Sequence, residues 1–232
     1  MEIRPEYRDK TIRSYVVRAG RMTKAQRSAF DSGWDRYGLR LADGKIDIES
    51  VFGRSATKVL EIGFGMGDSL LQMAIEQPNT DFIGIEVHPP GVGSLINAAA
   101  SKGVENLRLY LADATDVLSE CIAPQSLDRV QLYFPDPWHK KKHNKRRIVQ
   151  PEFLQLIRDR LRVGGLLHMA TDWQPYAEQM LELVEATEGY ANTSDTGGYV
   201  PRPSYRPLTK FEKRGERLGH GVWDLMAKTI NI

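Results

Sequence analysis

Three acidic residues of this chain occur in or just after short apolar stretches of strand length. Glu61 lies in the first stretch, Glu86 ends the second, and Asp113 follows the third. In an open parallel sheet, ligands bind at the carboxyl ends of the strands, so the three carboxylates should share one edge. A carboxylate at that edge can accept hydrogen bonds from an ammonium group, from ribose hydroxyls or from the amino group of adenine.

A glycine-rich turn follows the first stretch and opens a predicted helix. Residues 61–68 read EIGFGMGD, with glycine at Gly63, Gly65 and Gly67. Glycines let a backbone approach a ligand closely and adopt conformations that a Cβ atom forbids. The dinucleotide fingerprint G-x-G-x-x-G would place its third glycine at Asp68. The pattern therefore favours a different nucleoside ligand, with a dinucleotide site or a purely structural turn as the alternatives.

The acids and the turn together fit S-adenosylmethionine. Glu61 or Asp68 would hold the ammonium group of the methionine moiety, and Glu86 would bind both ribose hydroxyls. Asp113 would accept a hydrogen bond from the adenine amino group, beside the backbone of Ala114. Since the ribose contact is shared with NAD sites and fold alone decides no function, a dehydrogenase is the weighed alternative.

A second loop, after the fourth stretch, carries the candidate catalytic residue. Residues 133–138 read YFPDPW, so two prolines stiffen the backbone around Asp136. The loop is similar to the Asp/Asn-Pro-Pro-aromatic loop of enzymes that methylate nitrogen, which favours a nitrogen target. The alternative is a rigid turn in which Asp136 only caps the backbone.

A basic strip follows this loop directly. Residues 139–147 read HKKKHNKRR and carry six formal positive charges. Such residues contact phosphates and supply affinity that does not depend on nucleic-acid sequence. A metal site at His139 and His143 is rejected, because six neighbouring cations disfavour metal binding. The alternative is a solvated surface, but residues 1–27 and 198–232 are also basic, with net charges of +5 and +4, on an otherwise acidic body.

Strand-length and helix-length segments alternate from residue 58 onward. We expect strands at 58–62, 81–85, 107–111, 129–134, 166–170 and 222–229, and helices at 69–75, 92–102, 151–162 and 174–187. This alternation predicts a parallel α/β sheet with helices on both faces. We expect a single domain over residues 31–232, preceded by a basic, flexible arm over residues 1–30.

Composition limits the setting of the protein. The chain has 232 residues, 41% of them hydrophobic, and a single cysteine. Its first twenty residues hold no apolar core of a secretory signal, and its apolar stretches are too short to span a membrane. These observations predict a cytoplasmic protein that does not act at a membrane.

Several motifs together resemble the bacterial tRNA (guanine-N7)-methyltransferases. They are residues 61–67, Glu86-Val87-His88, residues 134–138 with the lysine run, Thr171-Asp172-Trp173, Thr209-Lys210-Phe211-Glu212 with Arg214-Gly215, and residues 18–22. The resemblance extends from the arm to the last strand. It implies a Rossmann-like class I fold with a mostly parallel seven-stranded sheet and an antiparallel last strand.

The resemblance also implies a reaction and a site. The family methylates N7 of a guanine in the variable loop of tRNA, at position 46, giving 7-methylguanosine and S-adenosylhomocysteine without a metal. It would place S-adenosylmethionine on Glu61, Glu86, Asp113 and Asp136. Substrate contacts would come from Lys140, Asp172, Thr209, Lys210, Phe211 and Glu212. RNA contacts would come from Lys142, His143, Asn144, Lys145, Arg146 and Arg147. We expect no obligate protein partner and favour a monomer over a homodimer.

Residue roles within this site stay open at the level of sequence. Asp136 could stabilise the positive charge of the methylated ring or accept hydrogen bonds from guanine N1 or N2. Asp172 could instead cap a helix, and Glu212 could form a surface ion pair with Lys213 or Arg214. Two rival functions are methylation of another nitrogen and an RNA-binding module with an inactive methyltransferase fold.

Overall fold

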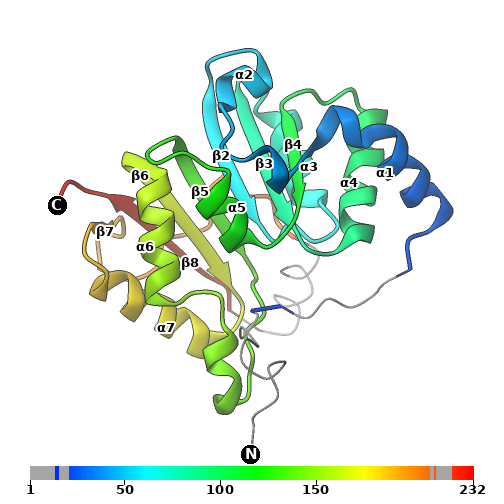
Figure 1. Ribbon diagram of the computed structural model, residues 1–232. Helices are drawn as coiled ribbons and strands as arrows, with labels where there is room; N and C mark the ends of the chain where they lie inside the picture. The colour runs from blue at the N-terminus through cyan, green and yellow to red at the C-terminus, as the bar shows by residue number, and fades with distance from the viewer. Residues whose placement is uncertain (1–13, 16–20, 210–211, 213–220) are drawn as a thin grey trace, which may run out of the picture.

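The computed structural model describes residues 14–15, 21–209, 212 and 221–232 (Figure 1). Lys210, Phe211, Arg214, Gly215 and most of the predicted arm lie outside the described residues. No helix in the described ranges is long and apolar enough to cross a membrane.

A twisted sheet forms the centre of the molecule. Its order is β1-β4-β3-β2-β5-β6-β8-β7. The strands are β1 (Gly38–Leu39), β2 (Thr57–Ile62), β3 (Thr80–Glu86), β4 (Leu107–Leu111), β5 (Leu127–Tyr133), β6 (Leu161–Thr171), β7 (Tyr190–Asn192) and β8 (Trp223–Thr229). Neighbouring strands pair in parallel as far as β6, and β8 pairs antiparallel with both β6 and β7.

The mostly parallel sheet with an antiparallel last strand is therefore confirmed. The described residues form eight strands rather than the expected seven. Two short strands, β1 and β7, are missing from the six that the residue pattern predicted, and β1 adds two residues to the outer edge of β4. Two residues are too few to show the alternation by which a strand is recognised in a sequence.

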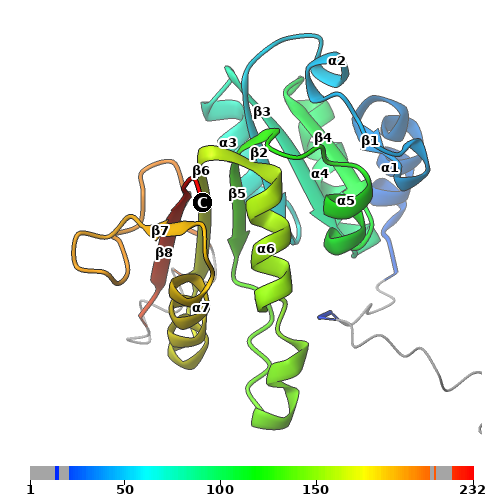
Figure 2. The same ribbon diagram turned by 60° about the vertical axis from the view of Figure 1, so that its left-hand side comes forward.

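Helices cover both faces of the sheet (Figures 1 and 2). They are α1 (Lys24–Tyr37), α2 (Ile48–Phe52), α3 (Asp68–Glu76), α4 (Pro89–Ser101), α5 (Ala114–Glu120), α6 (Pro151–Arg160) and α7 (Gln174–Ala186), with 3-10 turns η2 (Leu41–Asp43) and η3 (Lys141–Arg146). Side chains of α1, α3 and α4 pack in one apolar cluster, and those of α5, α6 and α7 in another. The two clusters lie on opposite faces because side chains alternate along each strand.

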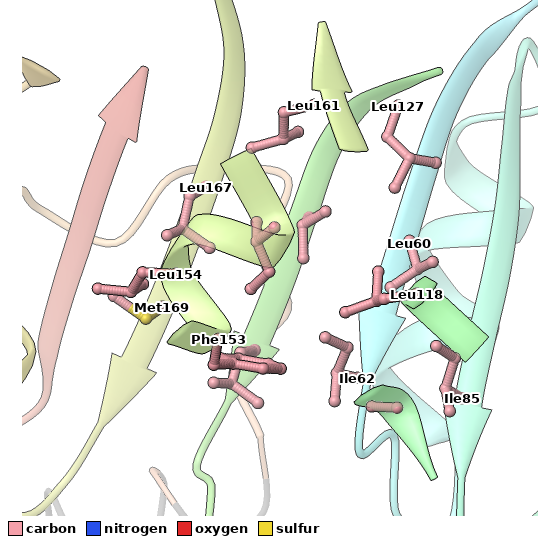
Figure 3. Packing of buried hydrophobic residues seen from close by; sticks show 14 of the residues in the cluster. Leu60, Ile62, Ile85, Leu118, Leu127, Phe153, Leu154, Leu161, Leu167 and Met169 are labelled. Atoms are coloured by element: carbon pink, nitrogen blue, oxygen red, sulfur yellow. The ribbon is translucent and has the colours of Figure 1, made fainter. Parts of the chain in front are cut away.

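The second cluster shows this packing at close range (Figure 3). Leu60 and Ile62 of β2 point toward Leu118 of α5, and Leu167 of β6 points toward Leu154 of α6. Each of these side chains is at least 96% buried. Burial of one such side chain stabilises the fold by roughly 1.5–3 kcal/mol, so this cluster fixes the strands that carry the site.

Helix α1 begins at Lys24, inside the segment that the sequence assigns to the arm. A capping box holds its first turn, in which Thr23 and Gln26 exchange side-chain and backbone hydrogen bonds. The helix packs closely on α4, since a Cβ atom on Gly93 would lie 2.6 Å from the carbonyl oxygen of Gln26. Residues 24–30 therefore belong to the folded body.

Candidate active site

A cavity of about 780 Å³ opens at the carboxyl ends of the central strands. Gly63, Glu86, Asp113 and Asp136, which follow or end β2, β3, β4 and β5, all line it. Ala114, Lys140 and His143 line the same cavity, as do Ser14 and Tyr15 from the N-terminal segment. The structure thus brings together most of the residues that the sequence marked on separate strands.

The glycine turn presents bare backbone to open space. Gly63, Gly65 and Gly67 have φ angles of +73°, +60° and +85°, which L side chains rarely adopt. A Cβ atom on Gly63 or Gly65 would meet no atom within 4 Å, so both positions form a cradle that a ligand can approach. A Cβ atom on Gly91, in the first turn of α4, would overlap the carbonyl oxygen of Gly65. The turn is therefore packed against α4 on one side, while the Cβ positions of Gly63 and Gly65 face open space.

Glu86 is fixed at the cavity wall by three backbone N–H groups. Gly65 donates to Oε2 over 2.7 Å, while Val87 and His88 donate to Oε1 over 2.7 and 3.1 Å. A carboxylate has about four acceptor positions, so the three N–H groups leave Glu86 about one position for a hydroxyl group of a ligand. Asp113 is similarly oriented, because its Oδ1 accepts a hydrogen bond from Thr115 as the N-cap of α5.

Glu61 differs from its expected place. Its side chain is 3% exposed and accepts a 2.6 Å hydrogen bond from Gln131 Nε2. Burial raises the pKa of Glu61 to about 7, against the lowering effects of Gln131 and Arg129. Glu61 is not among the residues that line the cavity. In this structure the carboxyl group is part of the sheet interior rather than of the cavity wall.

The loop that carries Asp136 is strained and braced. Phe134 and Trp138, on either side of Pro135-Asp136-Pro137, have φ angles of +52° and +46°. Such backbone conformations cost on the order of 1–3 kcal/mol each and are typical of functional sites. Hydrogen bonds hold both ends: Phe134 N–H donates to the carbonyl of Ala170 over 2.8 Å, and Trp138 Nε1 to that of Ser14 over 3.0 Å. Asp136 is exposed between these anchors.

The basic strip extends away from the sheet. In Figures 1 and 2, η3 is the short green helix that lies beyond the carboxyl ends of the strands. Its Lys141, Lys142 and Lys145 are exposed. The Arg146 guanidinium lies over the Trp138 ring, 4.1 Å from its centroid. Partial burial and the surrounding cations lower the pKa of His143, which disfavours the charged form of this ring.

Arg147 differs from the other residues of the strip. It is 4% exposed, whereas an RNA contact requires an accessible group. Its Nε donates to the carbonyl of Pro137 over 2.8 Å, and its Nη1 donates to Gln179 Oε1. Its guanidinium also lies over the Tyr176 ring, at 4.7 Å. Arg147 therefore braces the Asp136 loop from within the fold.

Asp172 follows β6 at the same edge of the sheet. The helix-cap alternative is not observed, because the N-cap of α7 is Trp173 and no side chain caps that helix. Asp172 is exposed. The adjacent Trp173 ring meets His139 edge-on, with ring centroids 4.4 Å apart. Asp172 is thus an exposed carboxylate next to Trp173, whose ring meets a residue of the cavity wall.

A buried polar network, which sequence reasoning missed, lies on the face of β5, β6 and β8 opposite α6 and α7. His168 Nε2 lies 2.7 Å from Asp224 Oδ1, and its Nδ1 lies 2.9 and 3.0 Å from the hydroxyls of Tyr133 and Tyr205. Asp224 also accepts two hydrogen bonds from Arg206. The signal in the sequence was polar residues at every second position of otherwise apolar strands, such as Gln131 and Tyr133.

Across the described ranges of the chain, no group of three His, Cys, Asp or Glu side chains is arranged to hold a metal ion. The residues present instead suit an organic cation with a nucleoside. The open glycine cradle accepts close contact, and oriented carboxylates face the cavity from β3 and β4. This donor set fits S-adenosylmethionine.

Solved structures of similar fold are methyltransferases. The 16S rRNA methyltransferase KamB matches with a TM-score of 0.57 at 16% identity, covering 93% of this chain and 99% of that one. An rRNA methylase from Streptococcus thermophilus matches with a TM-score of 0.53 at 15% identity, covering 76% and 88%. The fold is that of the class I S-adenosylmethionine-dependent methyltransferases.

Sequence relatives define the family within that class. A family described as "Putative methyltransferase" matches residues 55–225. The tRNA (guanine-N(7)-)-methyltransferase of Saccharophagus degradans is 63% identical over 97% of this chain and 98% of its own length. That of Stutzerimonas stutzeri is 59% identical over 96% and 93%. The chain belongs to the tRNA (guanine-N(7)-)-methyltransferase family.

Proposed function

We propose that this protein transfers a methyl group from S-adenosylmethionine to N7 of a guanine in tRNA, at position 46 of the variable loop. The observation that carries the proposal is identity of 63% over nearly the whole of a tRNA (guanine-N(7)-)-methyltransferase. The cavity supports it, because it joins Gly63 of the glycine turn, Glu86, Asp113 and Asp136 at one edge of the sheet.

The main catalytic task of the protein in this reaction is to position the two reactants. S-adenosylmethionine supplies an electrophilic methyl group on a sulfonium. Guanine N7 has a free lone pair at neutral pH, so no side chain has to remove a proton before attack. Holding both partners in line then supplies much of the rate enhancement. Glu86 and Asp113 orient the nucleoside part of the cofactor, since backbone N–H groups fix both carboxylates.

Asp136 is the proposed catalytic residue. It lies at the cavity between two residues of positive φ, so its backbone is held in one conformation. The purine ring gains positive charge on methylation at N7. A preorganised carboxylate beside the ring stabilises that charge as it develops.

The exposed lysines of η3 are the proposed docking site for the tRNA backbone. They continue directly from the Asp136 loop and extend beyond the sheet edge (Figure 2). Phosphate contacts there would position the variable loop over the cavity. We further propose that the protein acts as a cytoplasmic monomer, without a metal, and releases S-adenosylhomocysteine.

The test is methyl transfer from labelled S-adenosylmethionine to unmodified tRNA, followed by nucleoside analysis. We expect 7-methylguanosine, and no label in a tRNA whose variable-loop guanine is replaced by adenine. A different methylated nucleoside would contradict the guanine N7 target. Absence of transfer by a protein that binds S-adenosylmethionine would favour another nitrogen-bearing substrate or a required partner. A protein that binds no S-adenosylmethionine would instead favour the inactive RNA-binding module.

A further inference from the structure

Arg206 is an uncommon feature of the interior: it is the largest side chain that is fully buried in the described part of the chain, at 0% exposed. Its Nε and Nη2 donate to the two oxygens of Asp224 over 2.7 and 2.8 Å. Such a two-pronged arginine–carboxylate pair fixes the guanidinium in one orientation. Asp224 belongs to β8, so Arg206 is anchored to the sheet.

Arg206 also holds the segment that carries Thr209. Its Nη2 donates to Glu212 Oε1 over 2.6 Å, and the other oxygen of Glu212 accepts the Thr209 N–H over 2.8 Å. The Thr209 hydroxyl in turn accepts the N–H of Glu212 over 3.1 Å. Thr209 and Glu212 are thus closed into a small hydrogen-bonded unit that is attached to the sheet through one guanidinium.

Glu212 is placed poorly for a substrate contact. It is 2% exposed, and each of its carboxylate oxygens already accepts a hydrogen bond from within the chain. This burial also disagrees with a surface position for Glu212, while Lys213 and Arg214 lie outside the described residues. The carboxylate is used to attach its own segment to Arg206.

Arg206 reaches the Asp136 loop as well. Its Cζ atom lies 5.6 Å from the ring centroids of both Tyr133 and Phe134. Phe134 is the first residue of the strained loop and lines the cavity. A cation at this distance from an aromatic ring is attracted to it. One buried side chain therefore contacts the base of the catalytic loop and the Thr209 segment together.

We propose that Arg206 is a positioning residue for methyl transfer, which sets the Thr209 segment relative to Asp136, and that Glu212 acts through Arg206 rather than on the guanine. The inference rests on the proposed function. It predicts that loss of the hydrogen bonds that join Arg206 to Asp224 and Glu212 lowers kcat. The KM for tRNA changes little, because exposed lysines of η3 provide the phosphate contacts.

The test compares Arg206→Lys, Glu212→Gln and the double variant in kcat and KM for unmodified tRNA. Lysine keeps the charge but cannot bridge two carboxylates. We expect kcat of each single variant to fall at least tenfold, while KM stays within about threefold of the wild-type value. The kcat of the double variant should be no lower than that of the less active single variant, because the effects of coupled residues are not additive. The matched control is Arg54→Lys, which weakens the Arg54–Asp81 pair near the opposite ends of the strands and should leave kcat unchanged.

The outcomes separate the hypotheses. The inference would be overturned if the loss in kcat of the double variant equalled the product of the two single losses, or if Arg206→Lys had a normal kcat. If Arg206→Lys does not fold, Glu212→Gln is assayed on tRNA carrying inosine, which lacks the guanine 2-amino group, at the target position. Positioning gives the same loss on both tRNAs, whereas contact with the amino group gives a loss that disappears with inosine. A wild-type protein that forms no 7-methylguanosine would instead refute the proposed function.

Discussion

Two glutamates on adjacent strands show how their surroundings give one residue type two roles. Glu86 ends β3 and is surrounded by three backbone N–H donors at the cavity wall. Glu61, on β2, is buried beside Gln131, and burial raises its pKa to about 7. The first is held as an oriented acceptor at the cavity wall, and the second carries its charge at a cost to the fold.

The stability of the protein should therefore depend on the protonation of Glu61. Because the folded pKa of about 7 exceeds the ordinary value of 4.5, Glu61 contributes most below pH 4.5, and the contribution is lost as pH rises through 7. The change across this range is on the order of 3 kcal/mol. Glu61→Gln should abolish it, so the variant gains in relative stability between pH 4.5 and pH 8. Urea unfolding of both proteins at several pH values measures this difference, and parallel pH curves would contradict it.

Asp136 offers a second test at this scale. Its side chain is exposed, so Asp136→Ala should leave the fold intact. We expect single-turnover methyl transfer to fall by about 10²–10³-fold, the loss typical of removing one preorganised electrostatic group. Circular dichroism controls for folding and calorimetry for cofactor binding. Near-normal turnover would remove Asp136 from the mechanism.

At the scale of the elements, the basic strip around η3 contains cations in two different environments. Lys141, Lys142 and Lys145 are exposed, while Arg147 is buried against the Pro137 carbonyl and the Tyr176 ring. The sequence HKKKHNKRR shows its charges but not their directions. Those directions depend on the 3-10 turn and on Gln179, which approaches from a helix far along the chain.

Replacing Lys141 and Lys142 by glutamine should weaken tRNA binding but leave the rate of methyl transfer within the bound complex unchanged. If each contacts one phosphate, the slope of log K against log salt should fall by about 0.7–0.9 per lysine. Filter binding at several salt concentrations measures the slope. Lys102→Gln, an exposed lysine at the C-cap of α4, is the control and should leave the slope unchanged. An unaltered slope in the double variant would place the tRNA elsewhere.

The elements that the sequence predicts are those with a local signal. Pro151 and Gln174 begin α6 and α7 as expected, and the strands from 58 to 134 appear within one or two residues. Helix α1 was missed because only Tyr37 of its residues is fully buried, so the helix has a weak apolar pattern. Gly63, Glu86, Asp113 and Asp136, which line the cavity, were found because each ends or follows a strand. Arg206 was not, since its partner Asp224 lies 18 residues further along the chain and only the fold brings them together.

At the scale of the whole molecule, one apolar cluster spans both halves of the sheet. It joins Leu60 of β2 to Leu167 of β6 across α5 and α6 (Figure 3). On the opposite face of β5, β6 and β8, the segment that contains Tyr205 and Arg206 covers polar side chains. The two halves of the sheet should therefore unfold together.

Leu60→Ala tests this coupling. Leu60 is fully buried, so its truncation should cost about 2–5 kcal/mol of unfolding free energy. We expect a single transition in urea that is the same by circular dichroism and tryptophan fluorescence. Val163→Ala, at a position of β6 that is 47% exposed, should change stability by about 0.5 kcal/mol or less. Two separated transitions would show that the halves are independent.

The place of β8 has a consequence for synthesis on the ribosome. β8 is made last of all the described strands, yet it lies between β6 and β7. Until residues 223–229 leave the ribosome, β6 has an open edge, β7 has no partner, and Arg206 and His168 lack the carboxylate of Asp224. An unpaired strand edge is prone to pair with other chains. The nascent protein therefore passes through a vulnerable interval that closes only when its last strand is inserted.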